Sequence, residues 1–281
     1  MKVLVTGAKG QLGRDVIKEL AAIPHKGVDI GDFDITDKSA VFAAFNEHRP
    51  SSVIHCAAYT AVDKAEDEPG LCRQINEAGT RHIAEACKET DAKIVYISTD
   101  YVFPGTGEGF YKPDDTTGAL SIYGKTKLAG EQAVRETVKK FFIVRISWAF
   151  GLGGNNFVST MLRLGKERSV LNVVNDQVGS PTYTADLAPL LAAMAHSTKY
   201  GIYHVTNEGI CSWAEFASEI FYQAKMDVKV NPIPSSEYPT KAKRPLNSRL
   251  CKDALEAAGF DRLPHWTDAL RRYLERSREK L

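Results

Sequence analysis

The 281-residue sequence predicts an α/β fold in which helices cover both faces of a doubly wound parallel sheet. Three observations lead to this prediction. Short apolar, β-rich runs alternate with amphipathic stretches through about the first 147 residues, and a loop with three glycines follows the first run. No hairpin turn such as Asn-Gly separates two runs. Parallel strands need helical crossovers, so this alternation favours a parallel sheet with right-handed connections.

The predicted sheet is assembled in chain order from strands and helices. Apolar, β-rich runs predict strands over residues 2–6, 27–30, 52–56, 93–98 and 141–147. Apolar residues at helical spacing predict the intervening helices over residues 14–23, 37–48, 69–90 and 122–139. Pro24 ends the first helix and Asp37 starts the second, because proline interrupts a helix and aspartate is a common N-cap.

The pattern loosens after Gly151. Helices are expected over residues 155–166, 184–196, 213–224 and 266–279, strands over 170–174 and 201–205, and a proline-punctuated loop over 235–249. We expect residues 151–177 and 207–281 to form a smaller C-terminal lobe over the carboxyl edge of the sheet, where ligands of such sheets bind. Residues from about 178 to 206 are expected to rejoin the main domain of residues 1–150.

Charge and composition exclude several classes of protein. Lys and Arg number 36 against 35 Asp and Glu, a balance that argues against a nucleic-acid-binding surface. The longest apolar runs are far too short to cross a membrane, and residues 1–6 lead directly into the glycine loop, which leaves no room for a signal peptide. The five cysteines include no C-x-x-C, as is typical of reduced thiols in the cytosol. We therefore expect a cytoplasmic protein.

Gly7, Gly10 and Gly13 stand between the first strand and the first helix. Glycine permits the unusual dihedral angles of a tight turn and lets backbone N–H groups approach a pyrophosphate closely. The positive end of the helix dipole favours the same anion. The loop therefore predicts a dinucleotide site, and with it a Rossmann-type sheet. Asp29 is the candidate acid at the end of the second strand for the ribose of that ligand.

Tyr123 and Lys127 lie four residues apart at the start of a predicted helix, so they share one face of it. An ammonium beside a phenol favours the phenolate, and we expect Lys127 to lower the pKa of Tyr123. A tyrosine tuned in this way can donate a proton to an alkoxide that forms on a substrate carbonyl. Thr99, at the end of a buried strand, would be a positioned donor to the same oxygen.

Residues 6–13 fit the T-G-x-x-G-x-x-G pattern near the N-terminus of proteins of the extended short-chain dehydrogenase/reductase family. The sequence resembles this family over essentially its whole length, and most of all its reductases of nucleotide-linked keto-sugars. The other segments that carry the resemblance are CAAYTAVD (56–63), STDYVF (98–103), YGKTK (123–127), RISW (145–148), NNF (155–157), DQVGSPT (176–182) and KRP (243–245).

The resemblance implies a reaction, a cofactor and a catalytic set. The reaction is reduction of the 4-keto group of dTDP-4-dehydro-6-deoxy-L-mannose to dTDP-L-rhamnose, with NADPH or NADH, for the synthesis of rhamnose-containing polysaccharide. Thr99, Tyr123 and Lys127 would be catalytic, with Tyr123 as the proton donor. No arginine follows the second strand to receive a 2′-phosphate, and the choice between the two cofactors stays open.

Further residues would contact the two ligands. The resemblance implies that the cofactor is bound by Gly7, Gly10, Gln11, Leu12, Gly13, Asp29, Asp34, Ile35, Ala57, Ala58, Tyr59, Tyr123 and Lys127. It implies that the sugar nucleotide is bound by Thr99, Asp100, Tyr101, Trp148, Asn156 and Arg244. A guanidinium fork matches phosphate oxygens, which gives Arg244 a physical case for the diphosphate. Asn76 matches a family asparagine near the active site, and an ordinary polar residue of a helix is an equally supported reading.

The metal and the oligomeric state are less determined. Some members of the family form dimers that magnesium bridges through acidic side chains, and Asp15 matches one of these positions. The other matching positions fall near Ala185 and Arg276, which are not acidic. The sequence therefore predicts no metal ligand set, leaves Mg²⁺ doubtful and leaves a homodimer open.

Other functions on the same fold stay open as alternatives. A 4,6-dehydratase would need a second carboxylate after the catalytic threonine, where this chain has Tyr101. Another nucleotide-sugar 4-ketoreductase would use the same residues, and a C4-epimerase would usually carry small residues around positions 99–101. A non-catalytic regulatory subunit that binds a dinucleotide is the alternative outside enzymes, and the complete set of Thr99, Tyr123 and Lys127 argues against it.

Overall fold

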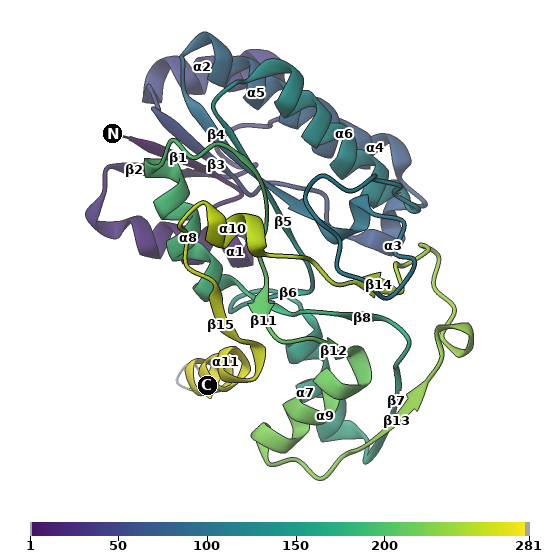
Figure 1. Ribbon diagram of the computed structural model, residues 1–281. Coiled ribbons are helices and arrows are strands. Elements are labelled where there is room, and N and C mark those ends of the chain that lie inside the picture. Colours follow the sequence, from purple (N-terminus) through teal and green to yellow (C-terminus); the bar gives the residue numbers. More distant parts are fainter. Residues whose placement is uncertain (1, 279–281) are drawn as a thin grey trace.

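The computed structural model describes residues 2–278. Its central sheet has six parallel strands in the spatial order β10-β5-β4-β3-β1-β2 (Figure 1). The strands are β1 (Val3–Thr6), β2 (His25–Val28), β3 (Ser52–His55), β4 (Lys93–Thr99), β5 (Phe141–Ile146) and β10 (Gly201–His204). The predicted doubly wound parallel sheet is confirmed. The order reverses at β1, which has β2 on one side and β3 on the other, and such a reversal opens a crevice at the carboxyl ends of the strands.

Helices cover both faces of this sheet. Helices α2 (Lys38–His48), α5 (Thr80–Glu89) and α6 (Ile122–Thr137) lie on one face, and α1 (Gln11–Glu19) and α8 (Thr184–His196) lie on the other (Figure 1). Alternate residues of a strand point to opposite faces. In β1, accordingly, Leu4 packs into the core under α2 and α5, whereas Val3 and Val5 pack into the core under α1 and α8.

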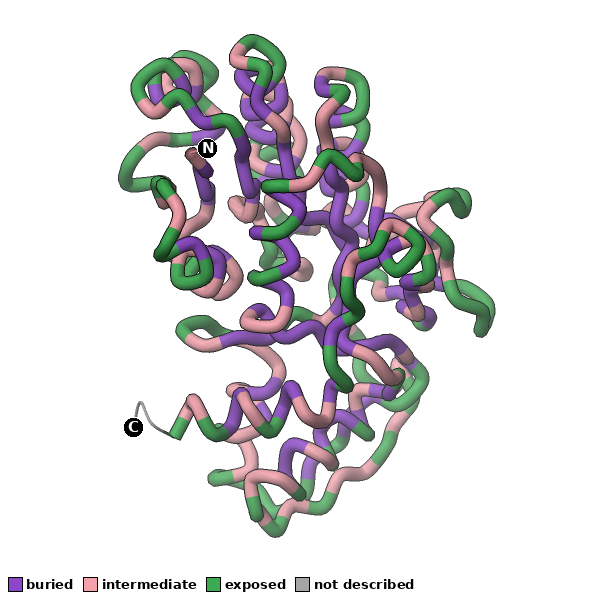
Figure 2. The backbone as a smooth tube through the Cα atoms, turned by 60° about the vertical axis from the view of Figure 1, so that its left-hand side comes forward, coloured by how far each residue is buried: buried purple, intermediate pink, exposed green. Residues whose placement is uncertain are grey.

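A smaller lobe lies beyond the carboxyl edge of the sheet. It contains α7 (Phe157–Glu167), α9 (Trp213–Ala224), α11 (Trp266–Arg278) and the paired strands β7 (Val170–Val174) and β13 (Lys229–Ile233). Phe150, Phe216 and Trp266 belong to its own hydrophobic core. Figure 2 shows that buried residues of this lobe, as of the sheet, lie on the faces that the elements turn toward one another.

Short strands connect distant segments around the lobe. Strand β8 (Val178–Gly179) pairs with both β12 (Cys211–Ser212) and β14 (Asn247–Ser248). Strand β6 (Ala149–Phe150) pairs with β9 (Thr182–Tyr183), and β11 (Asn207–Glu208) pairs with β15 (Leu263–His265). Strand β14 lies inside the segment for which a loop was predicted, so that prediction is wrong at residues 247–248.

Several predicted element bounds need correction. Helix α1 begins at Gln11, earlier than predicted, because Gly10 already has the extended backbone of an N-cap. The predicted helix 69–90 is confirmed up to Glu89, but its middle turn, Gln74–Gly79, is a π-helix between α4 (Pro69–Arg73) and α5. Helices α3 (Val62–Ala65) and α10 (Asp253–Ala257) were not predicted. Glu279, the predicted end of the last helix, lies outside the described residues.

Other local predictions are confirmed. Asp37 caps α2, where its carboxylate accepts from the backbone N–H groups of Ser39 and Ala40. Helices α8 and α9 have the predicted bounds. Within residues 2–278, no helix is both long enough and apolar enough to cross a membrane.

Candidate active site

A cleft of ≈ 810 Å³ opens at the carboxyl ends of the central strands. Its walls come from the segments that follow β1, β2, β3, β4 and β5, and its volume is in the range of small-molecule sites. All the predicted site residues line this cleft except Tyr59, Asn156 and Arg244. The fold therefore brings together residues that are more than 140 positions apart in the sequence, such as Gly7 and Trp148.

The glycine loop allows a very close approach between backbones. Gly7 has φ +66°, and a Cβ there would lie 2.7 Å from the backbone nitrogen of Ala57. A Cβ on Gly13 would lie 2.1 Å from the carbonyl oxygen of Gly7. Helix α1 starts at this loop with no side-chain cap and no acidic residue in its first turn. Uncapped N–H groups at a helix N-terminus that lines a cleft fit the pyrophosphate of a dinucleotide.

Two acidic residues follow β2 at the edge of the cleft. Asp29 accepts a hydrogen bond from the backbone nitrogen of Lys9 at 2.8 Å, which ties the end of β2 to the glycine loop. Asp34 accepts from the backbone nitrogen of Thr36 at 2.8 Å. Ile35 is buried and packs beside Gly79, where a Cβ would come within 2.8 Å of its side chain. All three line the part of the cleft where the adenosine half of a dinucleotide would lie.

The catalytic candidates converge from β4 and α6. Thr99 is the last residue of β4, and Tyr123 is the second residue of α6. Ser121 caps α6 by accepting from the backbone nitrogen of Gly124 at 3.1 Å, which fixes the start of the helix and so the place of Tyr123. The hydroxyl of Thr99 lies close enough to Tyr123 to affect the pKa of its phenol, and the ring of Tyr101 meets that of Tyr123 edge-on at 5.4 Å.

The direction of the Tyr123 pKa shift differs from the prediction. Burial raises the pKa of Tyr123, and the neighbouring hydroxyl of Thr99 only partly opposes this effect. Lys127 does not lower it here, because the ammonium of Lys127 donates to the carbonyl oxygen of Ile97 at 2.7 Å and lies over the ring of Tyr96. The expectation that Lys127 depresses this pKa is therefore wrong. Tyr123 instead carries its proton at neutral pH, as a proton donor must.

Lys127 is itself strongly affected by its surroundings. Burial lowers the pKa of Lys127 to about 7, and the negative charge of Glu131 opposes that shift. Glu131 lies one helical turn further along α6 and forms a buried ion pair with Arg145 of β5 at 2.7 Å. Ser98 donates to the same carboxylate at 2.5 Å. A polar network thus joins α6, β4 and β5 directly behind the catalytic candidates.

Asp100 and Trp148 line the cleft on the side of the lobe. Asp100 is 2% exposed and accepts hydrogen bonds from the hydroxyls of Thr99 and Ser248. Trp148 has a left-handed backbone with φ +50° and stacks on Trp213 at 3.7 Å between ring centroids. Trp213 therefore supports the indole from behind, while Trp148 keeps one side toward the cleft.

Three predicted ligand contacts are engaged elsewhere. The phenol of Tyr59 donates to Glu68 at 2.7 Å, although its backbone is held near the cleft by the buried side chain of Asn76. The amide of Asn156 caps α7 and donates to the side chain of Gln11 at 3.0 Å. The guanidinium of Arg244 pairs with Asp63 at 2.6 Å.

The residues around Asp15, which matches a magnesium position of some family members, do not fit a metal. The carboxylate of Asp15 accepts from the hydroxyl of Thr184 at 2.6 Å, and the guanidinium of Arg276 lies 3.6 Å from it. A cation of the protein itself therefore already neutralises this acid. Among the described residues, no group of three His, Cys, Asp or Glu side chains is placed to hold a metal ion.

Several cleft residues were not found from the sequence. Gln74 and Ile75 enter the cleft wall from the π-turn, which has no recognised signature in composition. Ser248 contacts Asp100 from a segment that was predicted to be a loop. The ion pair of Glu131 and Arg145 could have been suspected from charged residues in two apolar-rich elements, because such residues are buried only when they are paired.

Comparisons with known proteins agree with this geometry. The family model described as RmlD substrate binding domain matches residues 1–279. The chain is 45% identical over 278 residues to a dTDP-4-dehydrorhamnose reductase of Streptomyces griseus, which covers 95% of this chain and 91% of the relative.

Two crystal structures of similar proteins have nearly the same fold. A dTDP-4-dehydrorhamnose reductase from Clostridium acetobutylicum gives a TM-score of 0.97 at 45% identity, covering 99% of this chain and 100% of that one. The corresponding protein of Bacillus anthracis, in complex with NADP, gives 0.95 at 46% identity, covering 98% and 99%. This chain therefore belongs to the RmlD family, the family of the dTDP-4-dehydrorhamnose reductases.

Proposed function

We propose that this chain reduces dTDP-4-dehydro-6-deoxy-L-mannose to dTDP-L-rhamnose with NADPH or NADH, as a step toward rhamnose-containing polysaccharide. The observation that carries the proposal is the convergence of Thr99, Tyr123 and Lys127 in a cleft that begins at an uncapped, glycine-lined helix N-terminus. Relatives at 45% identity over nearly the whole chain are dTDP-4-dehydrorhamnose reductases, which supports the same substrate.

The proposed roles follow from the position of each side chain. Tyr123 keeps its proton because burial raises its pKa, and it donates that proton to the C4 oxygen. Thr99 offers a second donor to the same oxygen. Lys127 holds the ribose of the dinucleotide. When bound, the reduced nicotinamide supplies the hydride that the C4 carbon accepts.

The lobe of residues 151–177 and 207–281 is proposed to bind the sugar nucleotide, with residues 1–150 and about 178–206 as the dinucleotide domain. Asp100, Tyr101 and Trp148 would contact the sugar from the boundary of the two. Arg244 donates to the hydroxyl of Tyr101 at 3.3 Å while it pairs with Asp63, so its guanidinium lies beside the cleft, where the diphosphate would share it with Asp63. The remaining cofactor contacts are proposed at the residues of the glycine loop and at Asp29, Asp34, Ile35, Ala57 and Ala58.

The test is oxidation of NADPH and of NADH with the keto-sugar generated in situ, with identification of the product. We expect turnover with this substrate and none with dTDP-glucose, UDP-glucose or UDP-galactose. Tyr123→Phe should bind the dinucleotide normally and lose at least about 10²-fold in kcat, the usual scale of general acid catalysis. Tyr203→Phe is the matched control, because the phenol of this buried tyrosine donates to the backbone carbonyl oxygen of Lys199, away from the cleft.

The other outcomes identify the alternatives. Formation of the C4 epimer of the product would indicate a different 4-ketoreductase with the same machinery. Conversion of a UDP-sugar without net oxidation would indicate an epimerase. Dinucleotide binding with no turnover of any substrate would overturn the proposal and favour a regulatory subunit. Near-normal turnover of Tyr123→Phe would refute the assigned roles.

The location and the assembly are also proposals. We propose a cytoplasmic enzyme, since all five cysteines are free thiols in the structure and such thiols are typical of a reducing compartment. A homodimer is compatible with the fold but would have to form without a metal at Asp15.

A further inference from the structure

Asp100 is a buried acid whose side-chain hydrogen-bond donors are neutral. It is 2% exposed, and its two carboxylate oxygens accept separately from the hydroxyls of Thr99, at 2.9 Å, and of Ser248. The cations around the cleft have other partners, since Lys127 donates to Ile97, Arg145 pairs with Glu131 and Arg244 pairs with Asp63. A buried carboxylate without a cation is costly to ionise, so its charge depends closely on the hydroxyls that it contacts.

The hydroxyl of Thr99 has a single proton, and this proton has two competing destinations. In the structure it points to Asp100, while the Thr99 oxygen accepts from the backbone nitrogen of Tyr101 at 3.2 Å. While this proton is bound to a carboxylate, Thr99 cannot donate it to a substrate oxygen. A neutral carboxyl is a much weaker acceptor and would leave the proton free to turn.

We propose that Asp100 controls the direction of the Thr99 hydroxyl, that reduction proceeds fastest with the Asp100 carboxyl neutral, and that Ser248 sets the pH at which this carboxyl ionises. The inference rests on the proposed reductase function. The neutral carboxyl can donate its own proton to the oxygen of Ser248, so Thr99 becomes a second donor to the C4 oxygen beside Tyr123. Ionisation withdraws that donor, and loss of one such donor lowers kcat by roughly 10²-fold.

Ser248 acts from a different part of the chain and does not line the cleft. It belongs to β14, which pairs with β8. It packs so closely beside Gly179 that a Cβ added to this glycine would lie 2.8 Å from the Cβ of Ser248. Trp148 lies at 3.2 Å from the same hypothetical Cβ. Ser248 is therefore a positioning residue of the lobe, fixed in place by the contact with Gly179, and acts on the reaction only through Asp100.

The titratable groups around Asp100 determine how the effect is measured. Tyr101 lies on the same turn as Asp100, and Tyr123 lies on α6. Both phenols are neutral near pH 7 because burial raises their pKa values. Burial raises the pKa of Asp100 to about 6, and the hydrogen bonds of Ser248 and Thr99 oppose this shift. Lys127 titrates in the same range, because burial lowers its pKa to about 7. A variant of Asp100 itself is therefore needed to separate the two groups.

The test compares the pH profile of kcat in wild type, Ser248→Ala and Asp100→Asn from about pH 5 to 9. We expect a fall of kcat with rising pH in wild type. In Ser248→Ala the fall should move to higher pH by about half to one unit, because one hydrogen bond to the carboxylate is lost. The KM for the sugar should change little. An amide does not ionise. In Asp100→Asn, kcat should therefore no longer show the fall with rising pH that is due to Asp100, which is the same fall that Ser248→Ala moves to higher pH.

Ser180→Ala is the matched control. Ser180 is equally buried, at 2%, and donates to the backbone oxygen of Gly209 rather than to an acid. It should lose similar stability and keep the wild-type pH profile. An unshifted profile in Ser248→Ala, or a full wild-type fall in Asp100→Asn, would overturn the proposal.

A direct titration separates this inference from the proposed function. The Asp100 carboxyl is followed by ¹³C NMR in the NADPH complex of wild type and of Ser248→Ala, and Asp100→Asn assigns its signal. We expect a higher pKa in Ser248→Ala, and equal values would contradict the role of Ser248. This readout needs no turnover. If the keto-sugar is not reduced at all, the proposed function fails, while the control of Asp100 by Ser248 is still decided.

Discussion

Lys127 is 3% exposed and lies one helical turn after Tyr123, with its ammonium on the carbonyl oxygen of Ile97. Desolvation acts on the charged form, so burial lowers the pKa of this amine while it raises the pKa of the phenol. Both shifts have the same cause and opposite signs. Near neutral pH they leave Tyr123 protonated and Lys127 close to its midpoint.

Dinucleotide binding is therefore expected to take up protons through Lys127. Above about pH 7 the free protein holds much of this lysine as the neutral amine, and an anionic ligand near it favours the ammonium and raises its pKa. Calorimetry of NADPH binding near pH 7.5, in buffers of different ionisation enthalpy, should show proton uptake in wild type and little in Lys127→Met. Lys252→Met is the control, because burial also lowers the pKa of Lys252 but this residue lies outside the cleft. Equal uptake in wild type and Lys127→Met would exclude this lysine as the source.

Sequence reasoning at the residue scale succeeded where spacing determines position. Tyr123 and Lys127 share a helix face because they are four residues apart, and the cleft contains both. The pKa direction of Tyr123 could not be obtained in this way. The pKa depends on how deeply the phenol is buried and on which group the ammonium of Lys127 contacts. The spacing of Tyr123 and Lys127 in the sequence determines neither of these.

Helix α6 carries both the proposed catalytic residues and a buried ion pair. Its first turns present Tyr123 and Lys127 to the cleft, and its next turn presents Glu131 to Arg145 of β5. Both members of this ion pair are at most 2% exposed. Two parallel guanidinium bonds, at 2.9 and 2.7 Å, hold the carboxylate in a fixed orientation. The pair thus fixes the distance between the helix that carries Tyr123, the proposed proton donor, and the strand that leads to Trp148.

Glu131→Gln should lower the free energy of unfolding by about 3–5 kcal/mol, because it leaves a buried guanidinium without a counter-charge. Glu167→Gln is the isosteric control in the exposed pair with Arg163, and it should cost less than about 1 kcal/mol. Urea unfolding measures both. Replacing Glu131 and Arg145 together by methionine should restore part of the loss, since no buried charge then lacks a partner. If the Glu131→Gln protein were as stable as Glu167→Gln, the buried ion pair would contribute no more to the free energy of unfolding than an exposed one.

Helices were predicted correctly where the spacing of apolar residues or a capping residue within the segment itself marks them. Helix α8 was predicted with its observed bounds, and Asp37 was identified as the cap of α2. The π-turn over Gln74–Gly79 was not, because it extends an otherwise regular helical pattern by a change in hydrogen bonding alone. Two-residue strands such as β14 also escape prediction, since their existence depends on a partner about 70 positions away rather than on their own composition.

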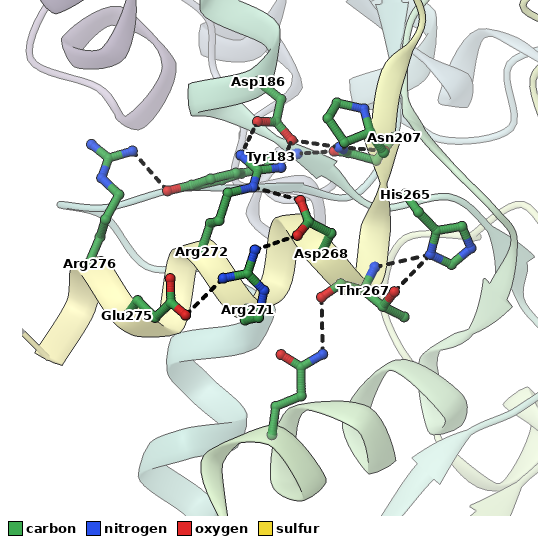
Figure 3. Close-up of polar contacts among 12 residues, drawn as sticks. Tyr183, Asp186, Asn207, His265, Thr267, Asp268, Arg271, Arg272, Glu275 and Arg276 are labelled. Carbon is green, nitrogen blue, oxygen red and sulfur yellow. Dashed lines mark hydrogen bonds and ion pairs between the residues drawn. The ribbon is translucent and has the colours of Figure 1, made fainter.

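At the scale of the whole molecule, α11 connects the lobe to the layered domain (Figure 3). Arg272 pairs with both Asp186 of α8 and Asp268 of its own helix, and Arg276 donates to the hydroxyl of Tyr183 at 2.8 Å. The alternation of strands and helices was enough to predict the layered domain. It was not enough for this connection, because charged residues on an amphipathic C-terminal helix look like an ordinary solvent-exposed face until the facing acids are known.

The position of Arg276 leads to a prediction about metal dependence. Its guanidinium lies 3.6 Å from Asp15, and the same carboxylate accepts from Thr184, so this acid already has a counter-charge and a hydrogen-bond donor. A divalent cation would have to displace Arg276 and would find Ala185 in place of another acid. Neither EDTA nor millimolar MgCl₂ should therefore change the sedimentation coefficient or the Tm.

Arg276→Glu provides the matched comparison for that measurement. It replaces the cation beside Asp15 by a second carboxylate, and two like charges at this distance repel unless a cation lies between them. The Tm of this variant should fall in EDTA and recover at least partly with MgCl₂, while the wild type responds to neither. Dissociation or a Tm loss of the wild type in EDTA would show that a metal is bound despite Arg276. In that case the guanidinium of Arg276 alone would not be enough to neutralise the carboxylate of Asp15.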